Sequence, residues 1–337
     1  MNWVTRMWFQ GAWYQWLFLP FSLLFAALSG LRRWLYKTGF SKQTAVSAPV
    51  IVVGNISVGG NGKTPVVVAL CDALKQAGFN VGVVSRGYGS TATQFPFDVT
   101  PDLTPDKTGD EPLLIARRCQ VPVVIDPKRP RGAQHLITQH HCDVIISDDG
   151  LQHYALGRDI ELVVVDGRLF GNGQLLPMGP LREGMWRLDT VDTIIFNQGA
   201  GDTSVPKSLQ PYNPIEMRFV AGELHNVVNP QMRLAVSDLA NQSKPITALA
   251  GIGDPQRFFK QLQQLGLTLD HTVALPDHHA ISEDDIPARA VVMTEKDAVK
   301  AAKFAHDDCW YQPISAQFSG QFLDNIIEQL RRIQRQY

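Results

Sequence analysis

The sequence predicts an α/β fold in which a doubly wound, mostly parallel sheet is joined to a second, smaller α/β lobe and preceded by an N-terminal membrane-associated helix. Three observations support this prediction. Runs of β-branched residues alternate with helical stretches, a glycine-rich loop separates the first such run from the first helix, and the N-terminus is apolar and basic. We expect four segments: an anchoring segment over 1–42, a core over 46–205, a linker with short strands over 206–244, and the smaller lobe over 245–337.

The composition suits a globular protein of about two domains and argues against some partners. The chain has 337 residues, of which 45% are hydrophobic and 19% are charged, so it can form a large core. The formal net charge of -1 gives no overall basic field, and no nucleic-acid partner is expected. The four cysteines form no C-x-x-C pair, which favours reduced thiols in a cytoplasmic compartment over a disulfide framework or a zinc ribbon.

The N-terminal segment has the composition of a membrane anchor. Every formal charge before Asp72 is basic, and residues 7–31 carry none. This stretch is about long enough to cross a bilayer, and the early tryptophans with the flanking Arg32, Arg33 and Lys37 suit the headgroup region. We therefore expect attachment to a phospholipid surface. A buried core helix and a cleaved signal peptide are the alternatives.

The elements after the anchor follow from residue pattern and turn chemistry. Residues 50–53 form a β-branched run typical of a buried parallel strand, residues 66–77 form a helix that ends at Gly78, and residues 79–84 form the second strand. Further strands are expected at 121–125, 143–147, 162–165, 191–196, 246–250 and 290–293, and a last amphipathic helix near 322–333.

The segment 54–65 (GNISVGGNGKTP) has the features of a phosphate-binding P-loop. Its glycines let backbone N–H groups converge on phosphate, Lys63 can reach the β- and γ-oxygens, and Thr64 offers a hydroxyl to Mg²⁺. The strict pattern has glycine where this chain has Ser57, and a plain glycine-rich turn is the alternative. The flanking strand and helix favour phosphate binding. The predicted ATP-binding residues are Ser57, Val58, Gly59, Gly60, Asn61, Gly62, Lys63 and Thr64.

An acidic turn follows the predicted strand at 143–147. Asp148 and Asp149 match the Walker B arrangement, in which carboxylates complete the Mg²⁺ shell together with the P-loop threonine, here Thr64. A solvated acidic loop is the alternative. Together the two motifs predict binding of ATP with Mg²⁺ for NTP hydrolysis or phosphoryl transfer, and they leave the acceptor open.

A series of uncommon segments runs in one order along most of the chain. They are GNISVGGNGKTP at 54–65, SRGYG at 85–89, GDEPL at 109–113, DDGLQH at 148–153, FGNG at 170–173, LPMGPLRE at 176–183, PDHH at 276–279 and TEKDAVK at 294–300. This series resembles the tetraacyldisaccharide 4'-kinases of the lipid A pathway, which also have Ser57 in the loop. The resemblance implies transfer of the ATP γ-phosphate to the 4'-hydroxyl of an acylated glucosamine disaccharide 1-phosphate, giving lipid IVA. It also implies a two-stranded linker between the lobes and a location on the cytoplasmic face of the bacterial inner membrane.

The resemblance implies roles for individual residues as well. Asp110 would be the catalytic base and His278 its partner, so that the two lobes would have to close on each other, and Lys63 would complete the catalytic set. The metal ligands would be Thr64, Asp148 and Asp149. The substrate contacts would be Arg86, Arg129, Arg182 and Glu183, with Arg131 competing with Arg129 for one place.

Other interpretations stay open at this point. A membrane-attached P-loop ATPase switch that acts through a protein partner would explain the loop and the anchor, but not Asp110 or His278. A soluble ATP-dependent ligase would leave the N-terminus unexplained. Residues 277–279 could form a metal site, although neighbouring histidines do not easily face one ion. Residues 294–297 have the wrong order for a guanine-reading loop and are expected only to lie near the nucleotide.

Overall fold

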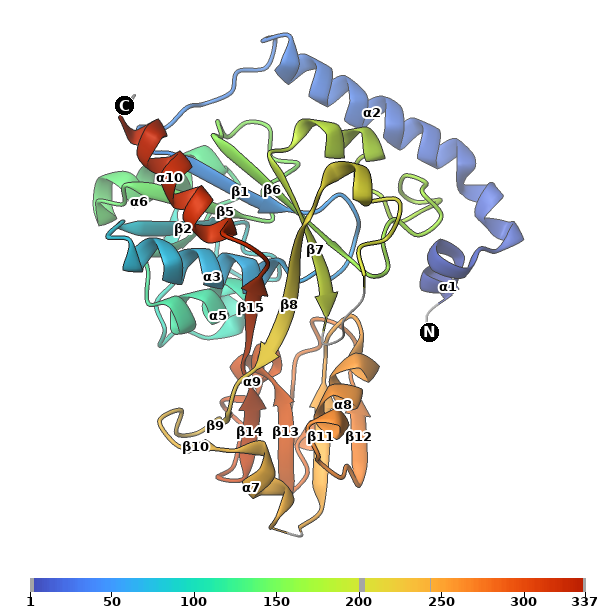
Figure 1. Ribbon diagram of the computed structural model, residues 1–337, viewed down its shortest axis with the longest axis vertical. Helices are drawn as coiled ribbons and strands as arrows, with labels where there is room; N and C mark the ends of the chain where they lie inside the picture. Colours follow the sequence, from blue (N-terminus) through green and yellow to red (C-terminus); the bar gives the residue numbers. More distant parts are fainter. Residues whose placement is uncertain (1–2, 200–203, 243, 336–337) are drawn as a thin grey trace.

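The structure, a computed structural model, describes residues 3–199, 204–242 and 244–335. Two α/β lobes lie one above the other along the long axis, and an N-terminal helical segment lies against the larger lobe, away from the smaller one (Figure 1). The predicted fold class is therefore confirmed, and both predicted sheets are present.

The larger lobe is built on a nine-stranded sheet in the order β15-β8-β7-β6-β1-β5-β2-β4-β3. Every neighbouring pair is parallel except for the edge strands β3 and β15, which pair antiparallel with β4 and β8. The strands are β1 (Val50–Gly54), β2 (Val81–Ser85), β3 (Phe97–Asp98), β4 (Val123–Ile125), β5 (Val144–Asp148), β6 (Ile160–Asp166), β7 (Thr193–Gly199), β8 (Ile215–Ala221) and β15 (Ile314–Phe318).

Side chains from both faces of this sheet are buried, which is why its central strands are continuously apolar. In β1, Ile51 and Val53 pack with helices of one face, while Val50 and Val52 pack on the other. The first face is covered by α3 (Lys63–Gln76), α5 (Asp110–Cys119) and α10 (Phe322–Gln334), and the second by α6 (Arg129–His140). The shorter helices of this lobe are α4 (Pro105–Thr108), η2 (Met185–Thr190) and η3 (Gln210–Tyr212).

The smaller lobe has a six-stranded sheet in the order β10-β9-β14-β13-β11-β12. Strands β11 to β14 are parallel to one another, and β9 and β10 continue the sheet in antiparallel fashion. The elements are β9 (Leu224–Asn226), β10 (Arg233–Leu234), α7 (Val236–Ala240), β11 (Ile246–Ala250), α8 (Pro255–Gln264), β12 (His271–Ala274), η4 (Glu283–Asp285), β13 (Ala290–Thr294), α9 (Glu295–Ala301) and β14 (Cys309–Gln312).

Two antiparallel strands connect the lobes. The chain enters the smaller lobe through β8 and returns through β15, and both strands belong to the edge of the larger sheet (Figure 1). The returning chain ends in α10, whose Phe322 and Ile326 pack into the core of the larger lobe. The expected lobe boundaries differ from this arrangement, because 245–337 assigned β15 and α10 to the smaller lobe. The reason is that the apolar face of a helix shows that the helix is packed, but not against which sheet.

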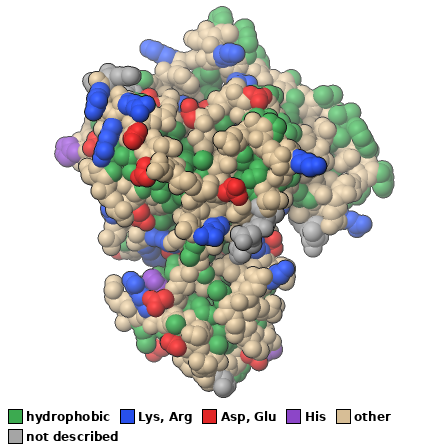
Figure 2. Space-filling model, viewed as in Figure 1, with side chains coloured by type: hydrophobic (Ala, Val, Ile, Leu, Met, Phe, Trp, Pro, Cys, Tyr) green, Lys and Arg blue, Asp and Glu red, His purple; other side chains and the backbone are tan. Residues whose placement is uncertain are grey.

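The N-terminal segment consists of α1 (Trp3–Gln10), η1 (Trp13–Phe18) and α2 (Leu19–Lys37). Residues 13–37 form a helical stretch long and apolar enough to span a membrane by length and composition. Most of its large apolar side chains are exposed, and they gather along α2 in Figure 2. This exposure rules out the buried core helix.

The segment is docked on the larger lobe by a few specific contacts. Ser22 Oγ donates to the carbonyl of Leu175 at 2.9 Å, and Trp8 Nε1 donates to that of Pro177 at 3.0 Å. The guanidinium of Arg33 stacks on the ring of Trp186, 3.5 Å from its centroid. The N-terminal segment is therefore tied to residues within and on either side of the LPMGPLRE segment.

Candidate active site

The phosphate loop lies at the carboxyl end of β1, where the turn into α3 requires glycine. Gly62 caps the helix with a φ of 94°, and a Cβ there would lie 2.5 Å from Asn197 Nδ2. Asn197 donates from that nitrogen to the carbonyl of Asn61 at 2.9 Å, which fixes the loop to β7. The helix starts directly at Lys63, so its N-terminal dipole points at the loop.

Hydrogen bonds between side chains of the loop fix its conformation. Asn55 Nδ2 donates to Asn61 Oδ1 at 2.7 Å, and Asn61 Nδ2 donates to Ser57 Oγ at 3.1 Å. Ser57 thus has a structural use at the position where the strict pattern has glycine. Val58 uses its N–H on the carbonyl of Pro180 at 2.8 Å, so that group does not face a phosphate.

One cation beside the loop was not predicted. Arg168 follows β6, pairs with Asp166 at 2.8 Å, and donates to the carbonyl of Gly60 at 3.3 Å. A single arginine after an apolar strand carries no motif, so nothing in the sequence distinguished it from a surface residue.

The Walker B carboxylates occupy different environments. Asp148 ends β5 and is 1% exposed; its Oδ2 accepts a bond from Ser85 Oγ at 3.3 Å, and its buried Oδ1 has no hydrogen-bond partner. Burial, together with the charges of Glu111 and Asp149, raises the pKa of Asp148 to about 7. A buried carboxylate oxygen with no donor, at the end of the strand that pairs with β1 where β1 leads into the phosphate loop, fits a hard divalent cation such as Mg²⁺.

Asp149 is held between two cations. Lys63 Nζ lies 3.5 Å from Asp149 Oδ1, and Arg182 Nη1 bonds both carboxylate oxygens at 3.0 Å. Burial opposes its ionisation, but Lys63 and Arg182 outweigh this effect and lower the pKa of Asp149. The residue has a φ of 46°, a left-handed conformation that aspartate tolerates in tight turns.

Of the two competing arginines, Arg129 is the one near the Walker B turn. It is 2% exposed and donates to the carbonyls of Val84 (3.1 Å) and Asp149 (3.4 Å). Burial lowers the pKa of Arg129 to about 10, which still leaves it charged at neutral pH. Arg131 instead forms two bonds with Asp126, at 2.7 and 2.9 Å.

The other predicted substrate contacts differ in how far they are exposed and in whether the protein already binds them. Arg86 is exposed just beyond β2. Glu183 is 6% exposed, and its carboxylate accepts bonds from Gln152 (3.0 Å) and from the Tyr154 hydroxyl. The Glu183 carboxylate is thus occupied by the protein itself, while the neighbouring Arg182 faces the Walker B turn.

Asp110 and His278 meet across the two lobes. Asp110 begins α5 after Gly109, where a φ of 84° and a Cβ position only 2.6 Å from the carbonyl oxygen of Tyr88 both require glycine. His278 follows β12 in the smaller lobe, and its Nδ1 lies 3.1 Å from Asp110 Oδ2. His279, next in the chain, turns instead to Asp285 at 3.3 Å, so the two neighbouring imidazoles serve different partners.

The electrostatics of this pair favour an ionised Asp110. Burial opposes ionisation, but the hydrogen bond from His278 and the charge of Lys296 outweigh it and lower the pKa of Asp110 to about 2. The same hydrogen bond raises the pKa of His278. Asp110 is also close to the Walker B turn, because the charge of Glu111, the residue after Asp110, contributes to the raised pKa of Asp148.

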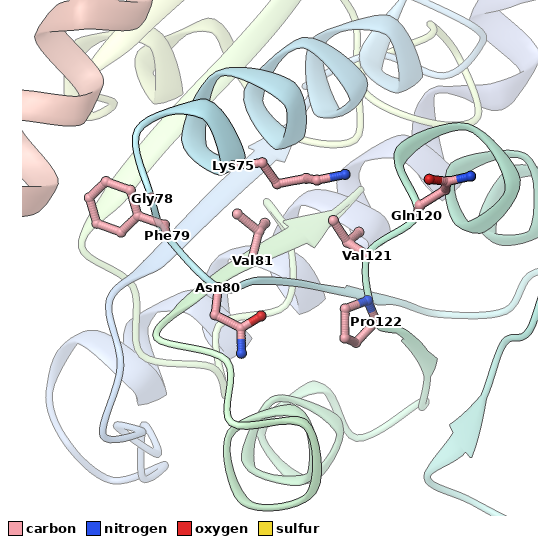
Figure 3. A pocket seen from close by; sticks show the side chains of 8 residues that line it. All are labelled: Lys75, Gly78, Phe79, Asn80, Val81, Gln120, Val121 and Pro122. Carbon is pink, nitrogen blue, oxygen red and sulfur yellow. The ribbon is translucent and has the colours of Figure 1, made fainter.

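A shallow hollow of about 290 Å³ lies elsewhere and has none of these features. It is lined by Lys75, Gly78, Phe79, Asn80, Val81, Gln120, Val121 and Pro122 (Figure 3). These residues lie at the amino ends of β2 and β4, the opposite edge of the sheet from the phosphate loop. We therefore place the active site at the carboxyl edge, between the lobes.

The fold and this site define a P-loop phosphotransferase with a two-lobed active site. The family model for LpxK, tetraacyldisaccharide-1-P 4'-kinase, matches residues 14–331. The chain is 50% identical over 333 residues to the tetraacyldisaccharide 4'-kinase of Aeromonas hydrophila, covering 97% of this chain and 96% of that one. It is 47% identical to the protein of the same name from Pseudoalteromonas atlantica, covering 94% of this chain and 100% of that one. The chain therefore belongs to the tetraacyldisaccharide 4'-kinase family.

A solved structure agrees with this assignment. The crystal structure of LpxK from Aquifex aeolicus in complex with ATP matches with a TM-score of 0.77 at 27% identity, covering 95% of this chain and 99% of that chain. The predicted family, the kinase activity and the use of ATP are thus confirmed, and the partner-regulated switch is not favoured.

Proposed function

We propose that this chain transfers the γ-phosphate of ATP to the 4'-hydroxyl of a tetraacyldisaccharide 1-phosphate, giving lipid IVA, with Asp110 as the base. The observation that carries the proposal is the Asp110–His278 contact of 3.1 Å, made by residues of different lobes beside a P-loop. A nucleotide switch has no need for such a base. A sugar hydroxyl loses its proton as it attacks, so a positioned carboxylate has a direct use in this reaction.

Each part of the site has a place in the reaction. The amides of the loop and Lys63 would hold the phosphates. Arg129 stabilises the Walker B turn through its hydrogen bond to the carbonyl of Asp149. Asp110 would take the proton from the attacking hydroxyl, and His278 would keep that carboxylate ionised and oriented. Alignment and charge neutralisation supply most of the rate enhancement in such transfers.

A divalent cation fits the donors that the site offers. Thr64, Asp148 and Asp149 provide hard oxygen ligands, and the unpartnered Oδ1 of Asp148 is buried where a cation would satisfy it. When bound, Mg²⁺ would neutralise charge on the β- and γ-phosphates. Lys63 and Arg182 also pair with Asp149 and neutralise its charge.

The apolar helix would keep the enzyme on the membrane that contains its substrate. Its exposed side chains are mostly apolar, as on a helix that inserts into lipid. The helix is docked next to the loop that carries Arg182. Because an acceptor with four acyl chains stays in the bilayer, the active site has to work at the surface. ATP is cytoplasmic, so we assign the enzyme to the cytoplasmic face of the inner membrane, bound to its phospholipid surface.

The test is transfer of radiolabelled γ-phosphate to extractable glycolipid in vesicles. We expect wild-type protein to label the glycolipid and Asp110→Asn to lower the rate by roughly 10²- to 10⁴-fold, the range of general base catalysis, with ATP affinity little changed. Partner-dependent release of free phosphate without labelled glycolipid would contradict the proposal.

A further inference from the structure

We infer that Lys296 is a positioning residue that couples closure of the two lobes to formation of the catalytic base. The inference rests on the proposed function, because it takes Asp110 as the base. Lys296 belongs to the TEKDAVK segment, for which neither the sequence nor the proposed chemistry gave a use.

Lys296 brings together carboxylates from both lobes. It lies in the first turn of α9 in the smaller lobe, and its side chain is 16% exposed. Its Nζ is 3.2 Å from Glu111 Oε1, 3.5 Å from Asp110 Oδ2 and 3.2 Å from Asp277 Oδ1. Asp110 and Glu111 belong to α5 of the larger lobe, whereas Asp277 belongs to the loop that carries His278.

This arrangement makes the charge state of the base depend on closure. Asp110, Glu111 and Asp277 converge, and without a cation their mutual repulsion would favour protonation of one of them. The smaller lobe supplies both neutralising groups that touch Asp110, which are His278 on its loop and Lys296 on α9. When the lobes separate, Asp110 loses the bond and the charge together, and it regains them on closure.

The other groups around this cluster do not replace Lys296. Lys300, one turn further along α9, is engaged with Asp297 at 2.7 Å. The ring of Tyr88 in the larger lobe lies against His278, with 5.3 Å between ring centroids, and supplies no ammonium or guanidinium group to the cluster. Among the described residues, Lys296 is therefore the lysine or arginine that pairs directly with Asp110.

The same interface provides a matched control. Arg118 on α5 pairs with Glu295 on α9, the residue before Lys296, and also bonds Ser315 Oγ at 2.9 Å. This ion pair joins the same two helices without touching Asp110. Its removal weakens closure alone, while removal of Lys296 weakens closure and also changes the charge at the base.

The experiment compares Lys296→Met, Lys296→Arg and Arg118→Met in steady-state kinetics on vesicle substrate between pH 5.5 and 9. We expect Lys296→Met to lower kcat at least about tenfold, the size of one lost charge-assisted bond, with KM for ATP within about threefold. Lys296→Arg keeps the charge and should recover most of kcat. Arg118→Met should have the smaller effect on kcat.

The pH profile separates positioning from simple packing. The positive charge of Lys296 lowers the pKa of His278, against the larger raising effect of the bond to Asp110. One limb of the pH profile should reflect His278, and His278→Gln identifies it by abolishing it. Lys296→Met should move this limb to higher pH, whereas Arg118→Met should leave it in place. If both variants lower kcat equally and neither moves the limb, Lys296 only joins the lobes and the inference is wrong.

ATP binding by each variant, measured by calorimetry, shows whether the variant is folded, and Lys296→Gln replaces Lys296→Met if the latter does not fold.

Two further outcomes separate this inference from the proposed function. A wild-type chain that fails to label glycolipid would overturn the proposed function itself. A wild-type chain that labels it, with Lys296→Met within threefold of its kcat, would overturn this inference alone.

Discussion

His278 offers the sharpest test of the Asp110–His278 pair, because its contribution can be estimated from the structure. The pKa of Asp110 falls from 3.8 to about 2 although the residue is buried, which corresponds to roughly 2.5 kcal/mol in favour of the ionised carboxylate. The bond from His278 is the largest favourable contribution, and hydrogen bonds to charged groups are worth about 1.5–3 kcal/mol. If that energy holds the base in place at the transition state, its loss lowers kcat by roughly ten- to a hundredfold.

We therefore expect His278→Gln to lower kcat by this factor in the labelled-phosphate assay while KM for ATP changes by less than about twofold. His279→Gln is the matched control, because His279 pairs with Asp285 and not with Asp110. A kcat within threefold of wild type for both His278→Gln and His278→Ala would refute the assigned role.

Three more predictions follow from the geometry. Since burial raises the pKa of Asp148 to about 7, its carboxylate is protonated below that pH, and Mg²⁺ affinity measured by calorimetry should fall by about tenfold per pH unit below 7 and level off above it; an affinity that is constant between pH 6 and 8 would contradict this. Gly62→Ala places a Cβ 2.5 Å from Asn197 Nδ2 at a φ of 94° and should weaken ATP binding at least tenfold with the fold retained, whereas unchanged affinity would show that the loop tolerates the change. The double exchange Leu24→Gln and Leu28→Gln on the exposed helix should reduce co-sedimentation with anionic vesicles and leave ATP binding intact, while the control Leu265→Gln in the smaller lobe should change neither property; full sedimentation of the double variant would remove the membrane role of this face.

The local parts of the site could be predicted from the sequence, because they lie within one strand–turn–helix unit. A β-branched run followed by glycines, Lys63 and Thr64 has few structural solutions, and Asp148 follows an apolar strand in the same way. Both predictions depend on neighbours in the chain. The structure adds the interior hydrogen bonds of the loop, in which Ser57 and Asn61 take part.

The packing of elements that are distant in the sequence could not be predicted. Hydrophobic periodicity shows which face of a helix is buried, but not which sheet it packs against. The amphipathic pattern of the last helix fits either lobe, and the structure returns it to the larger one. The resemblance favoured Arg129 over Arg131, but the residues Lys128 to Arg131 alone do not show which guanidinium reaches the carbonyl of Asp149. Lys296 stands in a helical segment with no phosphate or metal pattern, and only the approach of α9 to α5 brings it to Asp110.

The most direct measurement of the central claim is the stoichiometry and position of phosphate transfer in one reaction. Phosphorus NMR of the extracted glycolipid, taken together with the ADP formed, reports whether each γ-phosphate reaches the sugar. We expect one new phosphomonoester on the 4'-oxygen beside the existing 1-phosphate for each ADP, with negligible free phosphate. ADP formed with an equal amount of free phosphate and an unchanged glycolipid would contradict it.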